Sequence, residues 1–395
     1  MIRPAPVAVT GLGCLCAAGK NLPETLAALF RGERAPAPPR RFATSHPTPF
    51  PVFEVDEDFA GRDDLLRTSL LALAAADEAL AAAGWSRESL RPLRVGVCLG
   101  TTVGSAMNNE DFYRAYRQGE KPSLQPIRRF LDSNPAASLA KEYGFDGPCQ
   151  TVVNACSSGS DAVGLAASWI RAGLCDLALA GGADELCRTT CNGFNALMIA
   201  SDAPVSPFDR RRKGLNLGEG AGVLVLESEA LRGSRPARAF LRGYGAACDA
   251  HHLTAPHPEG AGLKRALTEA LAEAGATTAE IAFVNAHGTG TADNDRVESR
   301  VLAAMLPQVP FLSTKGYTGH CLGAAGGIEA ALTVACLAQG EIPASIGFVE
   351  PDPELPATPV TQTTAVTGDL ALSQSLAFGG NNAVLVFGRG NRGKA

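Results

Sequence analysis

The chain has 395 residues, of which 46% are hydrophobic, and its 35 lysines and arginines against 40 aspartates and glutamates give a net charge of -5. A chain of this length buries a sizeable hydrophobic core, either as one large domain or as two ordinary ones. The weakly acidic balance excludes a general attraction for nucleic acid or for an anionic membrane surface.

The N-terminal residues and the apolar segments predict a cytoplasmic protein without membrane contact. Residues 1–10 lack the shape of a signal peptide and lead directly into a strand pattern. We expect no membrane span, because Asp77 and Glu78 interrupt the alanine- and leucine-rich segment 70–83. The 11 cysteines are odd in number and lack the spacing of a zinc site, so we expect reduced thiols and no metal.

The first quarter of the chain predicts a strand, a helix and a second strand. Residues 7–13 form a short buried-strand pattern, and the proline- and arginine-rich segment 34–51 is typical of a surface loop. Apolar residues at helical spacing follow over 65–83 and stop at Gly84. A strand over 95–99 and a Gly-Thr turn at 100–102 come next.

A strand, a sharp turn and a helix are predicted around Cys156. The β-branched run 151–153 leads into NACSSGS over 154–160, and apolar residues at helical spacing continue until Gly173. Unpaired N–H groups and the positive end of the helix dipole meet at such a helix start, so we expect a lowered thiol pKa and a nucleophilic thiolate at Cys156. The alternative is an ordinary small buried cysteine.

The same order of elements recurs in the second half of the chain. A helix over 263–274 ends at Gly275, and a strand over 281–284 runs into another Gly-Thr turn. Three further matches keep the sequence order: 7–13 with 239–245, the Cys156 turn with 319–326 and the helix after it, and 222–227 with 382–387. These correspondences predict two duplicated α/β halves, residues 1–234 and 235–395, with mostly parallel central strands. Because equivalent helix starts carry Cys156 and His320, we expect these two residues to meet between the halves.

Two of the six histidines lie in glycine-rich turns after strand patterns. His287 belongs to NAHGTGT over 285–291, and His320 ends STKGYTGH over 313–320, which also holds Lys315. A cysteine with two histidines and no acidic orienter differs from the protease arrangement. Two neutral imidazoles that donate N–H bonds suit an enolate or carbonyl oxygen that gains negative charge. That is what decarboxylative carbon–carbon bond formation requires.

Together, these motifs resemble those of elongating β-ketoacyl-acyl-carrier-protein synthases, the thiolase-fold condensing enzymes, over nearly the whole chain. The motifs that carry the resemblance are NACSSG (154–159), PFDR (207–210), LGEGAG (217–222), NAHGTGT (285–291), STK and TGH (313–315 and 318–320), LGAAG (322–326) and FGGNN (378–382). The resemblance implies a thiolase-like α/β fold, in which two pseudo-symmetric halves form five layers, αβαβα.

The resemblance also implies an acyltransferase that extends an acyl group by two carbons through decarboxylative Claisen condensation. Cys156 would take the acyl group, and the backbone N–H groups of Cys156 and Phe378 would form the oxyanion hole. His287 and His320 would promote decarboxylation of a malonyl-carrier thioester and stabilise the enolate. Lys315, paired with Glu329, would hold the local charge network, with an ordinary structural ion pair as the alternative.

Further residues receive substrate-binding roles from the resemblance. Thr289 and Thr291 would hydrogen-bond the pantetheine arm, and Phe378 would gate the acyl pocket. The candidates for the pocket wall are Val103, Phe194 and Met198, with generic core packing as the alternative. No cofactor is implied beyond the phosphopantetheine arm of the acyl carrier protein, and no metal.

The C-terminal motif departs from the family pattern. QSLAFGGNN over 374–382 stands where the family usually has NSFGFGGTN, so Leu376, Ala377 and Asn381 alter the gating loop. The segment 199–206 is also shorter than in housekeeping members. These departures favour a specialised synthase, of an aryl-polyene or type II polyketide pathway, over the main fatty-acid elongase.

The implied partners are an acidic acyl carrier protein and a second ketosynthase-like subunit. Arg128, Arg129 and the basic run 210–213 are the densest candidates for carrier docking. The family pairs as homodimers, or as heterodimers with a catalytically dead chain-length factor.

Three other functions compete with an elongating synthase. A degradative thiolase is disfavoured because no cysteine follows Cys336. An initiating synthase would use cysteine, histidine and asparagine, whereas the motifs of this chain pair Cys156 with two histidines, His287 and His320. A non-catalytic chain-length or scaffold subunit normally lacks the nucleophile, which is present here as Cys156.

Overall fold

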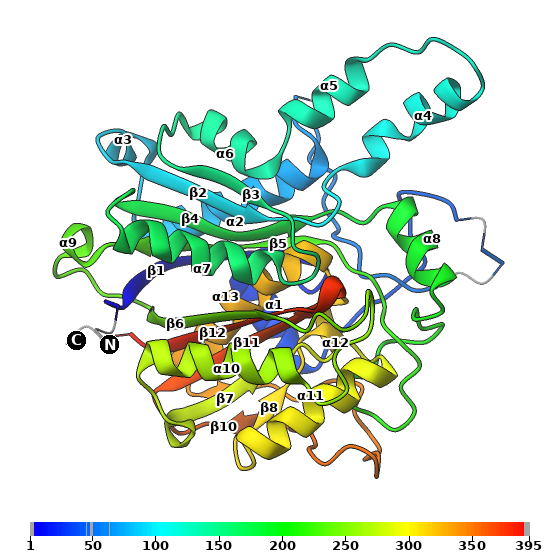
Figure 1. The fold of residues 1–395 in the computed structure, drawn as a ribbon. Coiled ribbons are helices and arrows are strands. Elements are labelled where there is room, and N and C mark those ends of the chain that lie inside the picture. The colour runs from blue at the N-terminus through cyan, green and yellow to red at the C-terminus, as the bar shows by residue number, and fades with distance from the viewer. Residues whose placement is uncertain (1–3, 45, 48–49, 63, 391–395) are drawn as a thin grey trace.

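The computed structural model describes residues 4–390 except 45, 48, 49 and 63. Its main strands and helices alternate along the chain (Figure 1). The ten strands of the large sheet are β1 (Val7–Cys16), β2 (Val95–Gly100), β3 (Cys149–Val152), β4 (Leu177–Asp184), β5 (Gly220–Glu227), β6 (Ala239–Cys248), β7 (Ile281–Asn285), β8 (Phe311–Leu312), β11 (Leu370–Ala377) and β12 (Asn381–Arg389). A separate small pair is formed by β9 (Glu341–Ile342) and β10 (Thr364–Ala365).

Helices cover both faces of the strands and also fill the space between them. The helices are α1 (Leu22–Arg31), α2 (Arg67–Ala83), α3 (Arg87–Leu90), α4 (Glu110–Arg117), α5 (Gln125–Asp132), α6 (Pro135–Tyr143), α7 (Ser158–Arg171), α8 (Arg188–Ala196), α9 (Glu229–Arg232), α10 (Ala261–Ala274), α11 (Ala292–Met305), α12 (Lys315–Thr318) and α13 (Ala325–Gln339). Short 3₁₀ turns are η1 (Ala106–Asn109), η2 (Thr278–Glu280), η3 (Leu322–Ala324) and η4 (Phe378–Gly380). As predicted, α2 ends at Gly84 and α10 ends at Gly275, and both glycines adopt the left-handed conformation.

The strand order confirms the predicted duplication. The strands lie in the order β3-β2-β4-β5-β1-β6-β12-β11-β7-β8, so each strand of the first half has its counterpart at the mirrored position of the second half. The halves join where β1 pairs with β6. Helices α7 and α13 lie between the strands of the two halves, whereas α2 packs on the outer side of the first half and α10 on that of the second (Figure 1). This arrangement is the predicted five-layered αβαβα architecture.

The prediction of mostly parallel central strands is wrong. All pairs from β4 through β5, β1, β6 and β12 to β11 are antiparallel, and the parallel pairs of the described sheet lie outside them, at β3-β2-β4 and β11-β7-β8. The connection before β12 explains one of the antiparallel pairs. A turn over 378–380 joins β11 to β12, and so short a connection permits antiparallel pairing alone. The counterpart strand β5 likewise returns beside β4 in the antiparallel direction.

The helix α13 forms part of the protein core. The segment Leu322–Gln339 is long and apolar enough to cross a membrane, contrary to the sequence expectation, but 83% of it is buried inside the protein. We therefore assign it to the core, where an apolar helix packed on all sides is expected. All 11 cysteines lie within the described residues and are free thiols, in agreement with the prediction.

The two central helices approach each other through glycine. A side-chain carbon at Gly159 of α7 would lie 2.6 Å from the backbone nitrogen of Gly327 and 2.9 Å from the carbonyl oxygen of Gly323. Contact therefore runs from backbone to backbone. As a result, the start of α7, next to Cys156, lies against the segment that follows His320.

We expect Gly159→Ala to lower the free energy of unfolding by roughly 2 kcal/mol or more, because the added carbon forces the helices apart. Alanine is otherwise favoured over glycine in a helix by about 1 kcal/mol, so the sign of the change is diagnostic. Urea unfolding followed by circular dichroism would measure it. Gly193→Ala in α8 is the matched control, since nothing lies within 4 Å of the added carbon there; equal effects at both positions would contradict the close packing.

Candidate active site

The nucleophile candidate Cys156 lies buried in a strained turn directly before α7. Ala155 has a φ of 49°, which a residue with a side chain rarely adopts. The hydroxyl of Ser158 supports the turn: it accepts a hydrogen bond from the backbone nitrogen of Asn154 at 2.7 Å and donates one to the carbonyl of Ala155 at 2.6 Å. The predicted strand, turn and helix are therefore present.

The predicted lowering of the Cys156 pKa is wrong for the unliganded site. Burial raises the pKa of the thiol to about 11, while the charge of Lys315 and the backbone N–H of Phe378 act in the opposite direction. The sequence indicates the helix start, but it does not indicate how completely the thiol is removed from water.

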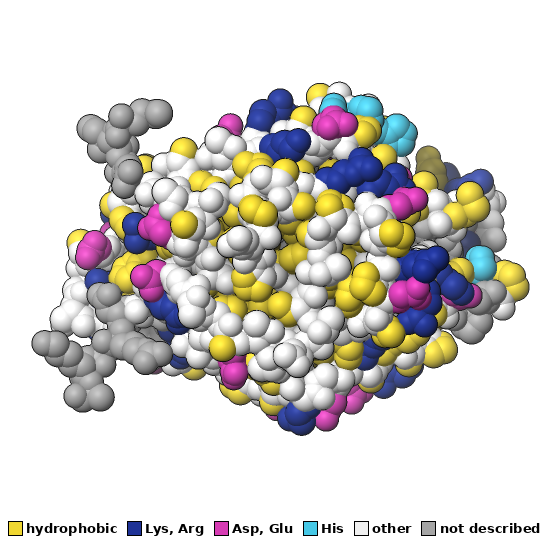
Figure 2. Space-filling view, turned by 90° about the horizontal axis from the view of Figure 1, so that it is seen from below, with side chains coloured by type: hydrophobic (Ala, Val, Ile, Leu, Met, Phe, Trp, Pro, Cys, Tyr) yellow, Lys and Arg dark blue, Asp and Glu magenta, His cyan; other side chains and the backbone are white. Residues whose placement is uncertain are grey.

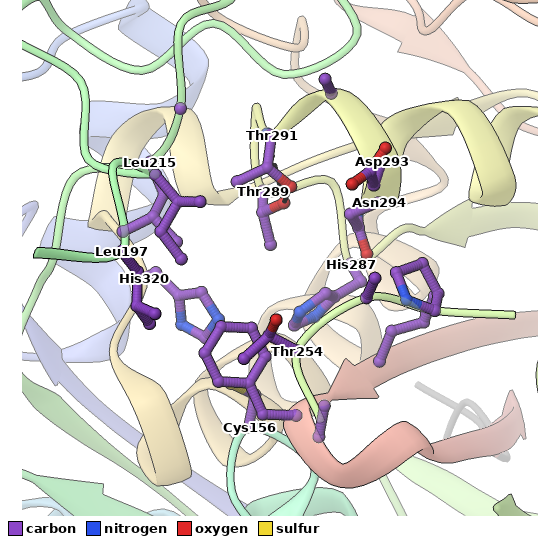
Figure 3. Close-up of a pocket in the computed structure, with 18 of the residues that line it drawn as sticks. Cys156, Leu197, Leu215, Thr254, His287, Thr289, Thr291, Asp293, Asn294 and His320 are labelled. Carbon is purple, nitrogen blue, oxygen red and sulfur yellow. Dashed lines mark hydrogen bonds between the residues drawn. The ribbon is translucent and has the colours of Figure 1, made fainter. Parts of the chain in front are cut away.

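Two histidines from the second half lie beside Cys156 (Figure 3). His287 follows β7, and Glu298 of α11 accepts hydrogen bonds from the backbone nitrogens of His287 at 2.6 Å and Gly288 at 2.7 Å. His320 follows α12, and its ring lies edge-on to that of His287 with 5.2 Å between centroids. The cysteine sulfur and the nearest nitrogens of both rings all lie within 4.8 Å of one another. The expected meeting of Cys156 and His320 between the halves is confirmed.

Hydrogen bonds determine which ring nitrogen of each histidine carries the proton. Nδ1 of His320 accepts the backbone N–H of Leu322 at 3.1 Å, and Nδ1 of His287 lies 3.0 Å from the Lys315 ammonium. Burial, together with the charge of Lys315, lowers the pKa of both imidazoles well below its usual value, so both are neutral. A neutral ring that accepts at Nδ1 holds its proton at Nε2. Both histidines therefore present an N–H donor.

The same protonation pattern disfavours a metal ion at this cluster. One cysteine and two histidines are a possible ligand set for zinc. Binding through Nε2 would move the proton of each ring to Nδ1, where Leu322 and Lys315 already donate. The arrangement therefore suits an oxygen that gains negative charge better than it suits a cation.

Lys315 and Glu329 form the predicted pair in the interior of the site. The Lys315 ammonium donates to the Glu329 carboxylate and, at 2.7 Å, to the backbone carbonyl of His287. Burial raises the pKa of Glu329 to about 7, while Lys315 acts in the opposite direction. Lys315 thus forms a buried ion pair with Glu329 and also determines which nitrogen of His287 carries the proton. A structural ion pair and a role in the local charge network are therefore compatible.

The turn between β11 and β12 brings Phe378 to the sulfur. Its backbone N–H group lowers the pKa of the Cys156 thiol, and both residues line the same cavity, which is the placement expected of an oxyanion-hole donor. Gly379 and Gly380 follow with φ values of 82° and 80°, which glycine adopts without strain. The Phe378 ring stacks on Phe194 of α8 with 5.7 Å between centroids.

A cavity of about 300 Å³ opens onto these groups. Thr289 and Thr291 line it, and their hydroxyls lie 2.8 Å apart. Phe194 also lines it, but Met198 is 88% exposed and so belongs to the rim of the cavity in the isolated chain. Val103 is absent from the residues that line the cavity. It packs instead against the hydrophobic cluster of Leu186, Leu215 and Leu322.

Several lining residues were not predicted from the sequence, and they are Leu197, Ile199, Leu215, Asp249, Thr254, Asp293, Asn294 and Asn382. Most belong to loops or chain segments that only the fold brings to the cavity. Glu298, which holds the His287 turn, was also missed. The available sequence signal was an acidic residue in the helix that directly follows the glycine-rich motif 285–291.

The predicted docking arginines differ in their surroundings. Arg212 is buried in ion pairs with Asp352 and Asp295 and therefore has a structural role. Lys213 remains exposed at the cavity, whereas Arg128 and Arg129 belong to α5 and lie outside the lining residues. On the face shown in Figure 2, lysine and arginine side chains gather toward one end, near the histidines of that face, and the centre is largely uncharged.

The lowered pKa of His320 makes folding stability depend on pH. As pH falls below about 6.5, the unfolded chain binds a proton that the folded site excludes, which costs the folded state about 1.4 kcal/mol per pH unit. When the pH falls from 7.5 to 5.0, we expect the free energy of unfolding to decrease less in His320→Gln than in the wild type. Urea unfolding at both values measures this difference. The same replacement at exposed His251 is the control, and an equal change in both variants would contradict the buried neutral ring.

Comparisons with known proteins agree with this geometry. The family model described as beta-ketoacyl synthase, N-terminal domain, matches residues 5–231, and the model of the C-terminal domain matches residues 238–349. The 3-oxoacyl-acyl-carrier-protein synthase 2 of Synechocystis sp. is 33% identical to this chain, over 96% of this chain and 97% of the relative.

Solved structures give the same result. The ishigamide ketosynthase/chain length factor has a TM-score of 0.91 at 33% identity, covering 98% of this chain and 100% of that chain. A type II PKS acyl-carrier protein in complex with its ketosynthase bound to the hexaketide has a TM-score of 0.87 at 28% identity, covering 98% and 99%. The predicted thiolase-like fold class and acyltransferase class are confirmed. Since both domain models match in tandem and the relatives align over almost their full length, the chain belongs to the beta-ketoacyl synthase family.

Proposed function

We propose that the chain is a catalytically active ketosynthase that condenses an acyl group on Cys156 with a malonyl-carrier thioester. The observation that carries the proposal is the cluster of one thiol and two neutral imidazoles within 4.8 Å, in which each ring holds its proton at Nε2. The relatives in this family make a condensing reaction the first expectation for such a cluster.

The first half-reaction transfers the acyl group. The Cys156 sulfur attacks the carbonyl of the acyl thioester, and the oxyanion that forms accepts the backbone N–H groups of Phe378 and Cys156. The bond to the pantetheine sulfur then breaks, and the proton lost by Cys156 ends on the departing thiol. Because burial raises the pKa of the Cys156 thiol to about 11, the thiol must lose its proton in the course of this half-reaction.

The second half-reaction uses the two histidines. The malonyl thioester loses carbon dioxide, and the electron pair moves onto the thioester oxygen as an enolate. The Nε2–H groups of His287 and His320 donate to this oxygen in a buried site, where hydrogen bonds to an anion are strong. The enolate carbon attacks the acyl-Cys156 carbonyl, the Cys156 thiolate leaves, and the product is two carbons longer.

The remaining roles follow from position. The hydroxyls of Thr289 and Thr291 line the cavity and would hydrogen-bond a pantetheine arm within it (Figure 3). Phe378, stacked on Phe194, also lines the cavity and would move to admit the acyl chain. The reaction needs no cofactor beyond the phosphopantetheine arm of an acyl carrier protein. Lys213 is the exposed basic residue of the predicted run that is best placed to meet the acidic carrier.

The substrate pathway is inferred from the altered gate. Leu376 and Ala377 precede Phe378, and Leu376 lines the cavity. We infer a specialised polyketide-type or aryl-polyene pathway, rather than housekeeping fatty acid synthesis, in the cytoplasm. A non-catalytic scaffold is the second candidate, but the complete set of Cys156, His287 and His320 favours catalysis.

We infer that the functional unit is a dimer, with a second copy or a chain-length-factor homologue. The sheet ends at the short edge strand β3, whose backbone is open to pairing, and Val153 beside it is exposed. Helices α4 and α5 bury none of their own residues, and they expose Tyr113, Tyr116 and Leu131. Both features are typical of a surface that a partner covers.

Replacement of Cys156 by alanine tests the catalytic proposal. We expect the wild type to gain one acyl group from a panel of acyl-carrier thioesters and to extend it by two carbons when malonyl-carrier protein is added. The Cys156→Ala variant should do neither, because it lacks the nucleophile. Intact-mass spectrometry and product analysis measure both steps. No acyl transfer by the wild type, even with a partner subunit present, would favour the scaffold.

The dimer surface is tested by the double variant Tyr113→Lys, Tyr116→Lys. We expect the dissociation constant of the dimer to rise at least about tenfold in this variant, because two charges replace apolar side chains that the partner would bury. Analytical ultracentrifugation of the chain alone and with a partner separates homodimer from heterodimer. Val349→Lys, at another exposed apolar position, is the control. Unchanged association of the double variant would exclude this surface.

A further inference from the structure

The carboxylate of Asp161, in the first turn of α7, holds both sides of the turn that carries Cys156. One oxygen, Oδ2, accepts the side-chain amide of Asn154 at 2.6 Å and the hydroxyl of Ser157 at 2.8 Å. Asn154 and Ser157 flank Ala155 and Cys156 in the sequence. The two bonds therefore fasten the turn on either side of the nucleophile.

These hydrogen bonds hold the backbone at Ala155 in a strained conformation. The left-handed conformation of Ala155 is unfavourable for a residue with a side chain and persists where its surroundings enforce it. The Ser157 hydroxyl also lies 3.0 Å from the carbonyl of Asn154, so the carboxylate belongs to a connected network. A carboxylate with both oxygens engaged holds such a network more firmly than a neutral group does.

The second oxygen of Asp161 is held from the other half of the protein. The hydroxyl of Tyr244, on β6, donates to Oδ1 at 2.8 Å. The Tyr244 ring reaches this position across Gly164, where a side-chain carbon would lie 2.4 Å from the ring. The hydrogen bond between Tyr244 and Asp161, for which Gly164 leaves room, thus links the Cys156 turn to the half of the protein that supplies His287 and His320.

We propose that Asp161, held by Tyr244, is a positioning residue that sets the Cys156 sulfur for acyl transfer. The role rests on the proposed ketosynthase function and adds a residue pair to it. Acyl transfer requires the sulfur to meet the acyl carbonyl while the resulting oxyanion meets the N–H of Phe378. Displacement of the sulfur by about 1 Å can slow such a step about 100-fold. Decarboxylation depends on the two histidines, which the pair does not contact.

The test compares Asp161→Asn and Tyr244→Phe with the control Tyr143→Phe. Asparagine keeps the shape of the side chain but places an NH₂ group where one of the acceptor oxygens was. Tyr143 donates to Asp77 at 2.7 Å, away from the site, so its replacement removes the same kind of hydrogen bond. Acylation of Cys156 from an acyl-carrier thioester is followed by intact mass. Carbon dioxide release from malonyl-carrier protein is measured in a Cys156→Ala background.

We expect Asp161→Asn to slow acylation at least about tenfold, and Tyr244→Phe to slow it about threefold or more, with Tyr143→Phe near wild type. In the Cys156→Ala background, the same changes should leave decarboxylation within about twofold, because they act through the nucleophile. Acylation rates within twofold of wild type in both variants would overturn the proposal. An equal loss of decarboxylation would also overturn it, since the whole site would then be disturbed.

Tyr244→Phe keeps the test decisive if Asp161→Asn does not fold, because it removes a single hydroxyl. An inactive wild type would refute the proposed function itself. Active variants beside an active wild type would refute the positioning role alone.

Discussion

The backbone contact between α7 and α13 is the constraint on which the rest of the structure depends. Gly159 meets Gly323 and Gly327 where any side-chain carbon would collide with backbone atoms. Both helices can therefore lie in one central layer, shared by the two halves of the sheet. Since Cys156 precedes α7 and His320 precedes α13, the same contact brings the nucleophile and an N–H donor together.

The buried charge of Lys315 organises the chemistry at this junction. It pairs with Glu329, bonds to the carbonyl of His287 and faces the Nδ1 of the same ring. Burial, together with the charge of Lys315, lowers the pKa of both histidines, and the Lys315 ammonium directs the proton of His287 to Nε2. The site is therefore prepared for an anion that forms during the reaction, while the resting cysteine stays protonated.

Where the sequence interpretation failed, the cause was an influence that acts across the fold. The thiol pKa of Cys156 was predicted from the helix start alone, but desolvation by surrounding elements has the larger effect. Strand direction was predicted from the alternation of strands and helices, yet the short turn before β12 makes its pair with β11 antiparallel, and the other central pairs are antiparallel as well. Val103 was assigned to the pocket wall from the family resemblance and Arg212 to carrier docking from its basic run, whereas the first packs against a hydrophobic cluster without lining the cavity and the second is buried in ion pairs.

The sequence by itself determined the family, the duplicated halves and the candidate reactive residues, because glycine-rich turns after strands and the order of motifs are local features. It also indicated that Cys156 and His320 occupy equivalent helix starts. Tertiary structure alone decided the proton positions on the histidines, the reach of Tyr244 to Asp161 and the lining of the cavity by Leu215 and Thr254. Each of these depends on distances between segments far apart in the chain, and on burial, which no local pattern encodes.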